Sequence, residues 1–127
     1  MTVNKVILIG YVGKLPDIKY FEGGGLVASF RMATTEKGYK GDNIQAPDRA
    51  QWHNVVASKG NAKLVESFVK VGTQVYVEGK LLSRMIDVPN SRSYELMEVH
   101  VSVFRVLGGG KEREEDYFFP DKSAHPD

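Results

Sequence analysis

The stretch Gln51-Trp52-His53-Asn54-Val55-Val56-Ala57-Ser58 holds the only tryptophan of the chain and lies near its middle. Its aromatic and β-branched residues predict a strand. Alternation then puts Trp52, Asn54, Val56 and Ser58 on one face and Gln51, His53, Val55 and Ala57 on the other, and neither face is cleanly apolar. Trp52 therefore has two interpretations. It fills a hydrophobic core, as a lone aromatic more often does, or it is an exposed platform for a flat ligand.

One helix and two strands are predicted after this stretch. Asn61 is a candidate cap for a helix that begins near Ala62, with Lys70 in its last turn and Gly72 just past its end. Its apolar positions recur at three- and four-residue intervals: Leu64, Val65, Phe68 and Val69. The strand Thr73 to Leu82 is expected to turn Val75, Val77 and Leu81 inward. In the strand Ser93 to Leu107, the buried series Met97, Val99, Val101 and Val103 alternates with the wet series Glu98, His100 and Ser102.

Three strand regions are predicted up to and including the central stretch. The first contains the apolar run Val6-Ile7-Leu8-Ile9, and Gly10 and Gly13 then mark a bend. A glycine-rich turn at Gly23-Gly24-Gly25 joins Ile18 to Phe21 with Leu26 to Thr35. In the latter, Phe30 and Met32 are predicted core, whereas Ser29 and Arg31 face outward.

Residues 36–50 have no usable period and contain several glycines, prolines and aspartates. They predict a long mobile hairpin loop, and loops of this length in a compact domain are often functional. Its basic and aromatic members favour a functional loop: Lys37, Tyr39, Lys40 and Arg49.

The order of elements decides the fold class. Three strand regions, one short helix and two further strands, with glycines at the bends, predict an all-β chain. We expect a five-stranded Greek-key barrel of the OB-fold type, with the helix between strands three and four.

Composition narrows the class of protein. A chain of 127 residues with 42% hydrophobic and 26% charged residues predicts one soluble domain, and the absence of cysteine excludes a disulfide scaffold. No signal peptide or membrane span is visible, which favours a cytosolic location. Residues 1–110 carry 14 basic and 10 acidic side chains, whereas residues 111–127 carry 3 and 6. A mildly basic body suits a polyanion partner, although plain solvated surface explains so small an excess as well.

Five segments of the chain resemble bacterial single-stranded DNA-binding proteins, in that family's order and spacing. They cover about residues 1–107 and are Val3 to Gly10, Gly24 to Ala28, Ala33 to Glu36, Gln51 to Val56 and Gly72 to Leu81. The resemblance implies an OB-fold, usually homotetrameric, that binds single-stranded DNA without strong sequence preference in replication, recombination and repair. It also implies a bacterial, nucleoid-associated protein without a cofactor.

The resemblance assigns base stacking to two aromatics. Trp52 falls on a stacking position in the third strand, and Tyr39 lies near a second one in the long loop. Two further aromatic positions of the family fall on Ser58 and near Ile86, which implies weaker or differently routed binding. Other aromatics are candidate substitutes, with ordinary packing as the alternative: Tyr20, Phe21, Tyr76 and Tyr94.

Phosphate contacts and subunit contacts complete the expected site. The candidate phosphate ligands, each of which is otherwise a plain surface charge, are Lys5, Arg31, Lys37, Lys59, Lys80, Arg84 and Arg92. The first strand, Val6 to Ile9, is apolar beyond what one face of a small barrel buries, which predicts association of copies through Val6, Ile7, Leu8 and Ile9. The resemblance implies that the assembly is a homotetramer, with a homodimer as the alternative. His53 matches a histidine that lies at the family's subunit contact, and a hydrogen-bonded strand histidine is the alternative.

The sequence divides into a DNA-binding domain at residues 1–107 and a glycine-led acidic tail at residues 108–127, expected to be disordered. Glu114 to Asp121 combines acidic and aromatic residues, as the partner-recruiting tip of the family does, but it is not terminal. The tail therefore either recruits replication and repair proteins or is a plain disordered end.

No constellation in the sequence predicts an enzyme. The histidines His53, His100 and His125 lack metal-ligand spacing, and no phosphate-binding loop motif occurs. We therefore expect neither catalysis nor a metal. The alternative to DNA binding is an OB-fold scaffold or primosome-type accessory protein that acts mainly through protein contacts, which the departures at Ser58 and Ile86 favour.

Overall fold

A ring of hydrogen-bonded strands forms the body of the computed structural model, which describes residues 1–43 and 45–109. The elements along the chain are β1 (Val6–Val12), β2 (Asp17–Tyr20), β3 (Leu26–Glu36), β4 (Tyr39–Lys40), β5 (Gln45–Ala46), β6 (Arg49–Ser58), α1 (Lys59–Phe68), β7 (Gln74–Ile86) and β8 (Tyr94–Gly108).

The main sheet has the strand order β1-β7-β8-β6-β3-β2, and an additional pairing between β1 and β3 closes it. β1 and β2 are the two halves of one bent first strand, which changes direction at residues 13–16. The other neighbours are antiparallel, but β6 and β8 run parallel where Val55 and Val56 lie opposite Val99 and His100. The predicted five-stranded Greek-key barrel with one short helix is therefore confirmed.

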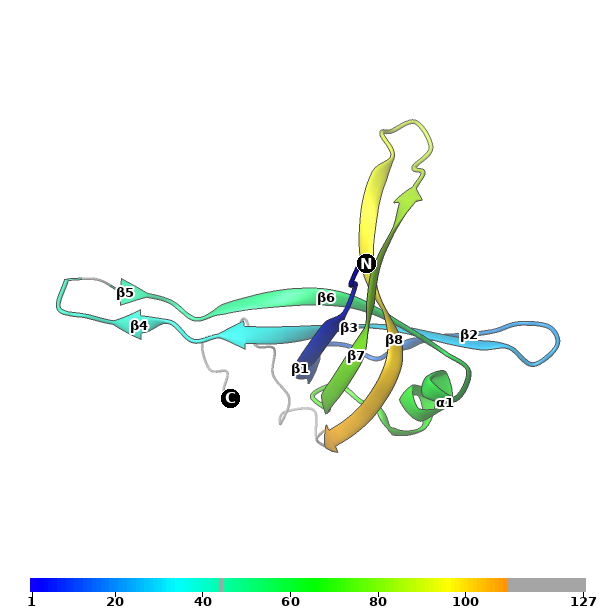
Figure 1. Cartoon of the computed structure of the whole chain (residues 1–127), viewed down its shortest axis with the longest axis horizontal. Coiled ribbons are helices and arrows are strands. Elements are labelled where there is room, and N and C mark those ends of the chain that lie inside the picture. The colour runs from blue at the N-terminus through cyan, green and yellow to red at the C-terminus, as the bar shows by residue number, and fades with distance from the viewer. Residues whose placement is uncertain (44, 110–127) are drawn as a thin grey trace.

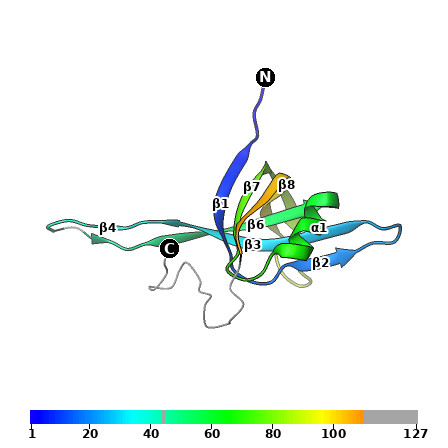
Figure 2. The same cartoon turned by 90° about the horizontal axis from the view of Figure 1, so that it is seen from below.

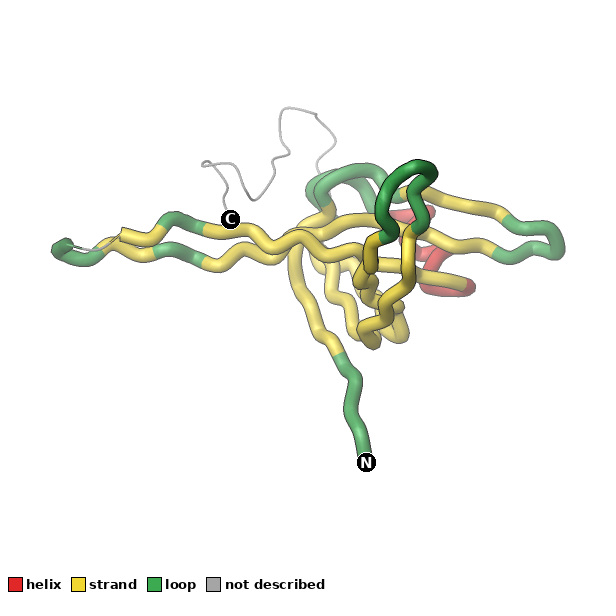
Figure 3. The backbone as a smooth tube through the Cα atoms, turned by 90° about the horizontal axis from the view of Figure 1, so that it is seen from above, coloured by secondary structure: helices red, strands yellow, loops and turns green. Residues whose placement is uncertain are grey.

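Three hairpins extend from the barrel in different directions (Figure 1). The β4–β5 ribbon continues β3 and β6, the β2–β3 turn lies at the other end of the same strands, and the long β7–β8 hairpin rises from the barrel. The residues before β1 project away from the barrel when it is seen from below (Figure 2) and from above (Figure 3).

The barrel core is built from the alternating apolar residues of the strands. Phe30 and Met32 are buried as predicted, and so are Val75 and Val77. Phe104, which is fully buried, meets Phe30 edge to face with ring centroids 6.0 Å apart.

Several predictions for β7 and β8 are wrong, and one of them concerns Met97, which was expected to be buried but is 44% exposed. Leu81 lies on the long hairpin and is 40% exposed, and Glu98, expected on the wet face, is only 7% exposed. In β8 the register shifts, because Val103 lies opposite Glu78 but Val101 lies opposite Gly79. This β-bulge changes the phase of the alternation, so that Phe104 rather than Val103 enters the core.

Helix α1 begins at Lys59, earlier than predicted. Ser58 is its N-cap residue, whereas the side chain of Asn61 donates a hydrogen bond to the carbonyl of Ser102 at 3.4 Å. The helix ends at Phe68, so the expected last-turn position of Lys70 is wrong as well. Its buried residues are Ala62 and Val65, which close one end of the barrel.

Residues 36–50 are more ordered than the predicted long loop. β3 continues to Glu36, β6 begins at Arg49, and these two residues pair. Beyond them Tyr39 pairs with Ala46, and the amide of Gly38 donates a hydrogen bond to the carboxylate of Asp48 at 2.8 Å. The segment is therefore largely a two-stranded ribbon.

Candidate nucleic-acid interface

Trp52 lies on the outer surface of the barrel. In β6, Val55 and Ala57 are buried, whereas Trp52, Asn54 and Val56 are partly exposed, as the predicted division of the two faces requires. Trp52 does not belong to the buried cluster found in the described part of the chain. The interpretation of Trp52 as a core residue is therefore wrong.

The indole ring of Trp52 is paired with a cation from the neighbouring strand. Ala33 lies directly opposite Trp52 in the β3–β6 ladder, and Arg31 is two residues earlier in β3, on the same outer face. The guanidinium carbon of Arg31 is 5.0 Å from the ring centroid, within the range of a cation–π contact. A positive charge and an aromatic surface therefore lie side by side.

A cleft of about 240 Å³ lies between the β3–β6 face and the β7–β8 hairpin. Arg31, Asn54 and Arg84 contribute polar groups to it from three strands. Its full lining is Lys14, Leu15, Asp17, Ser29, Phe30, Arg31, Asn54, Val55, Val56, Arg84, Leu96 and Glu98. We call it the tryptophan-side cleft, because Arg31 both lines it and contacts Trp52.

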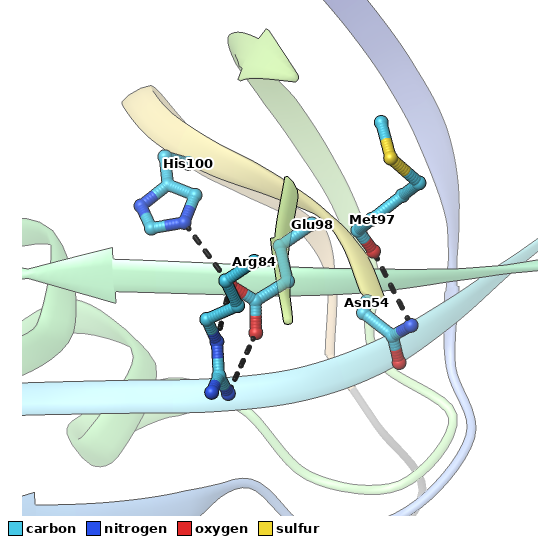
Figure 4. Close-up of polar contacts among 5 residues, drawn as sticks. All are labelled: Asn54, Arg84, Met97, Glu98 and His100. Carbon is cyan, nitrogen blue, oxygen red and sulfur yellow. Dashed lines mark hydrogen bonds and ion pairs between the residues drawn. The ribbon is translucent and has the colours of Figure 1, made fainter. Parts of the chain in front are cut away.

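Glu98 holds the wall of this cleft together, as Figure 4 shows. Its carboxylate accepts hydrogen bonds from Nε and Nη2 of Arg84, both at 3.3 Å, and lies 3.2 Å from Nε2 of His100. Burial alone would raise the pKa of the Glu98 carboxyl, but the hydrogen bonds and charges of Arg84 and His100 outweigh burial and lower this pKa. Glu98 is therefore a carboxylate at neutral pH. Nearby, Asn54 makes a long hydrogen bond of 3.5 Å to the carbonyl of Met97.

A second cleft, of about 430 Å³, lies between the residues just before β1 and the strands β7 and β8. Its lining is Asn4, Lys5, Glu78, Gly79, Lys80, His100, Val101 and Ser102, and we call it the lysine-side cleft. Lys5 forms an ion pair with Glu78 at 3.1 Å, and the hydroxyl of Tyr76 donates to the same carboxylate at 2.8 Å. These two hydrogen bonds lower the pKa of the Glu78 carboxyl. The contact between His100 and Glu98 connects the two clefts.

The candidate phosphate ligands separate into three groups. Arg31 and Arg84 line the tryptophan-side cleft, and Lys5 and Lys80 line the lysine-side cleft. Three exposed residues line neither cleft: Lys37 between β3 and β4, Lys59 at the start of α1, and Arg92 in the β7–β8 turn. Ion pairs already engage Lys5 and Arg84, so the structure does not present all seven charges equally.

Lys14 and Asn54 are polar residues of the cleft that sequence reasoning did not select. Asn54 shares the predicted outer face with Trp52, and this alternation was a signal that could have found it. Lys14 lies in the bend between β1 and β2, and only closure of the barrel brings that bend beside β6.

Tyr39 lies on β4, in the ribbon that leaves the barrel, and is 59% exposed. Tyr39 therefore lines neither of the two clefts, and the structure does not place it beside Trp52. A groove of about 480 Å³ follows the ribbon, and Tyr39 and Lys40 contribute to its lining.

Comparison with known proteins shows which family this barrel belongs to. The model of the single-strand binding protein family matches residues 3–107. The chain belongs to this family.

Known members and one solved structure agree with the family match. A single-stranded DNA-binding protein of Bacteroides thetaiotaomicron is 42% identical over 108 residues, which are 84% of this chain and 67% of that protein. One of Neisseria meningitidis is 32% identical over 88% of this chain and 64% of that protein. The chain thus spans about two thirds of the length of these curated relatives. A solved Plasmodium falciparum SSB complex with ssDNA is 33% identical, with a TM-score of 0.74, over 84% of this chain and 97% of that one.

The two family positions without an aromatic both lie at the surface. Ser58 is exposed at the end of β6. Ile86 is partly buried at the end of β7, where its partner across the ladder is Tyr94, which is 51% exposed. Two other candidate substitutes, Tyr20 and Phe21, are 68% and 53% exposed near the β2–β3 turn. The fourth, Tyr76, is engaged with Glu78.

The residues expected at the family's subunit contact alternate in burial. Val6 and Leu8 pack against the core, whereas Ile7 and Ile9 are 54% and 51% exposed. His53 lies with Nε2 at 3.0 Å from the hydroxyl of Thr34, and its burial lowers the pKa of the imidazole. Within one chain, His53 is thus a hydrogen-bonded strand histidine.

Three further expectations concern the acidic tail, a metal site and a membrane-spanning helix. Residues 110–127, which include almost all of the predicted acidic tail, lie outside the described residues. In residues 1–43 and 45–109, no group of three or more histidine, aspartate or glutamate side chains is placed to hold a metal ion. No helix of the described chain is long and apolar enough to span a membrane.

Proposed function

We propose that this protein binds single-stranded DNA without strong sequence preference and protects it during replication, recombination and repair. The carrying observation is Trp52, which lies on the outer face of the barrel beside Arg31 and a polar cleft. Membership of the single-strand binding protein family and the likeness to an SSB complex with ssDNA support the same function. Both favour it over the scaffold alternative.

In this proposal the outer face recognises features that every nucleotide has. Trp52 stacks on a base, because each base has a π-face, and Tyr39 stacks on a second base further along the ribbon. Lysine and arginine contact phosphates, with Arg31 at the tryptophan-side cleft and Lys80 at the lysine-side cleft. Arg84 and Lys5 line the same clefts, but ion pairs with Glu98 and Glu78 engage them in the absence of DNA. Lys37, Lys59 and Arg92 extend the cationic surface.

We further propose that the chain acts as a homodimer or homotetramer through β1. Ile7 and Ile9 support this contact, because two isoleucines more than half exposed on adjacent outward positions of one strand favour burial against a second copy. His53 remains a candidate member of the contact.

The domain boundaries and location of the protein belong to the same proposal. Residues 1–107 form the DNA-binding domain in this proposal, and residues 108–127 form a tail that recruits replication and repair proteins. We also propose that the protein acts in the bacterial cytoplasm, associated with the nucleoid. No catalytic role is proposed.

Titration with oligo-dT tests the function directly, because the chain has a single tryptophan. We expect quenching of Trp52 fluorescence that weakens as salt rises. Trp52→Ala should weaken binding by about 1–3 kcal/mol, the contribution of one stacked base, with little change in thermal stability. An unchanged fluorescence signal, together with no retardation in a gel shift, would refute DNA binding.

A further inference from the structure

Gly13 lies directly against the ring of Trp52. It is buried and follows the last residue of β1. A Cβ atom at this position would come under 3.0 Å from Cζ3 and Cη2, the outer edge of the six-membered ring, which is closer than real Cβ atoms approach. The indole therefore occupies the space that a side chain at position 13 would need.

The backbone of Gly13 does not itself require glycine. Among the described residues, the glycines with positive φ are Gly23, Gly24 and Gly72, so the φ angle of Gly13 is not in the left-handed region that favours glycine. The Trp52 ring thus leaves no room for a side chain at position 13.

Gly13 is also fixed relative to the other neighbour of the ring. Its amide donates a hydrogen bond of 3.0 Å to the carbonyl of Arg31. The guanidinium of this arginine is the group 5.0 Å from the Trp52 centroid. One β3 residue therefore anchors the backbone at the ring edge and places a cation over the ring face.

We propose that Gly13 is a positioning residue for DNA binding, which sets the orientation of the Trp52 indole together with Arg31. The inference rests on the proposed function of Trp52 as a base platform. A ring held in its binding orientation before DNA arrives loses less conformational freedom on stacking, and binds more tightly, than a ring that must be ordered by the ligand.

A double-mutant cycle tests the inference with four proteins: wild type, Gly13→Ala, Trp52→Phe and the double variant. Phenylalanine lacks the outer six-membered ring edge, so the added methyl group should collide only with tryptophan. Binding of a fluorescein-labelled oligo-dT is measured by anisotropy. We expect Gly13→Ala to weaken binding on the order of tenfold beside Trp52 but less than about twofold beside Phe.

Fluorescence of the protein without DNA gives a second readout, which reports the surroundings of the Trp52 ring. A substitution that only lowers the overall stability of the protein would leave this emission unchanged as long as the protein is folded. Gly13→Ala should shift the emission maximum of Trp52 before DNA is added, because the ring is displaced. Gly60→Ala is the matched control, since its new Cβ meets nothing within 4 Å, and it should leave both emission and affinity unchanged.

The outcomes separate this inference from the function on which it rests. Equal losses in both backgrounds, or an unchanged emission and affinity in Gly13→Ala, would overturn the positioning role alone. If Gly13→Ala does not fold, recovery of folding by Trp52→Phe supports the inference, and no recovery overturns it. Failure of the wild type to bind oligo-dT would instead remove the proposed function.

Discussion

The salt dependence of DNA binding should reveal which cations contact phosphate, and the lysine-side cleft offers a matched pair for this test. Lys80 and Lys5 line the same cleft, but Lys5 is already paired with Glu78 at 3.1 Å. In the part of the chain that the structure describes, no ion pair engages Lys80. We therefore expect Lys80→Ala to remove a phosphate contact and Glu78→Gln to release one.

The magnitude follows from counterion release. Of the seven candidate cations, two are in ion pairs with Glu78 and Glu98, which leaves five available. Each phosphate contact on a single strand contributes about 0.7 to the slope of log affinity against log salt. Five contacts predict a slope of about −3.5, a hundredfold loss between roughly 50 and 200 mM salt. Lys80→Ala should reduce this loss to about fiftyfold, and Glu78→Gln should increase it to about three hundredfold.

The assay is anisotropy of labelled oligo-dT at four or more salt concentrations, with unfolding curves to confirm that each variant remains folded. Lys63→Ala is the control, because this exposed lysine lies on α1 and lines neither cleft. Its slope should match that of the wild type. A slope unchanged by both Lys80→Ala and Glu78→Gln would show that the lysine-side cleft does not lie on the DNA path.

Three predictions concern the fold that carries the interface. Burial lowers the pKa of His53, so its contribution to stability is complete above about pH 6.5, the unfolded pKa, and is lost as the pH falls through the lower folded pKa. In His53→Gln, the free energy of unfolding measured in urea should therefore change less between pH 7 and pH 5 than in the wild type. The pKa of Glu98 is lowered as well, so its stabilisation is present above its unfolded pKa and is lost in acid; Glu98→Gln should destabilise the protein at pH 7 more than at pH 3. Phe104→Ala should cost about 3–5 kcal/mol of unfolding free energy, measured at pH 7, because the ring is fully buried against Phe30; a loss below about 1 kcal/mol would contradict this packing.

Alternation in the sequence was sufficient to predict the parts of the barrel in which each strand keeps one phase. Phe30 and Met32 in β3 and Val75 and Val77 in β7 are buried as their period predicts. The same argument placed Trp52 and Asn54 on one face of β6. It failed in β8, because a bulge is one extra residue that changes no amino-acid type. Val103 was therefore predicted in the core where Phe104 lies. The burial of Glu98 has another origin, its contacts with Arg84 and His100, which alternation does not reveal.

The site was less predictable than the barrel, because its residues meet only through tertiary contacts. Alternation assigned Arg31 to an outward face, but it left Trp52 open between core and surface, and only the resemblance to the family favoured the surface. Their contact depends on the β3–β6 register, in which Ala33 lies opposite Trp52. Gly13 looked like a simple bend, and no local pattern links it to a tryptophan almost forty residues later. The ion pairs that engage Lys5 and Arg84 are equally invisible in a one-dimensional charge count.

Glu98 explains how an outer face that binds a polyanion can contain a carboxylate between its two clefts. Its side chain is 8% exposed and is hydrogen-bonded to Arg84 on one side and His100 on the other. Because two positively charged or donating groups cover it, little of its negative charge reaches a passing phosphate. The arrangement does have a cost for binding, since Arg84 must share its charge between Glu98 and DNA. We therefore expect base stacking on Trp52 to contribute more than any single cation to affinity at physiological salt, because stacking on an aromatic face depends less on salt than a phosphate contact does.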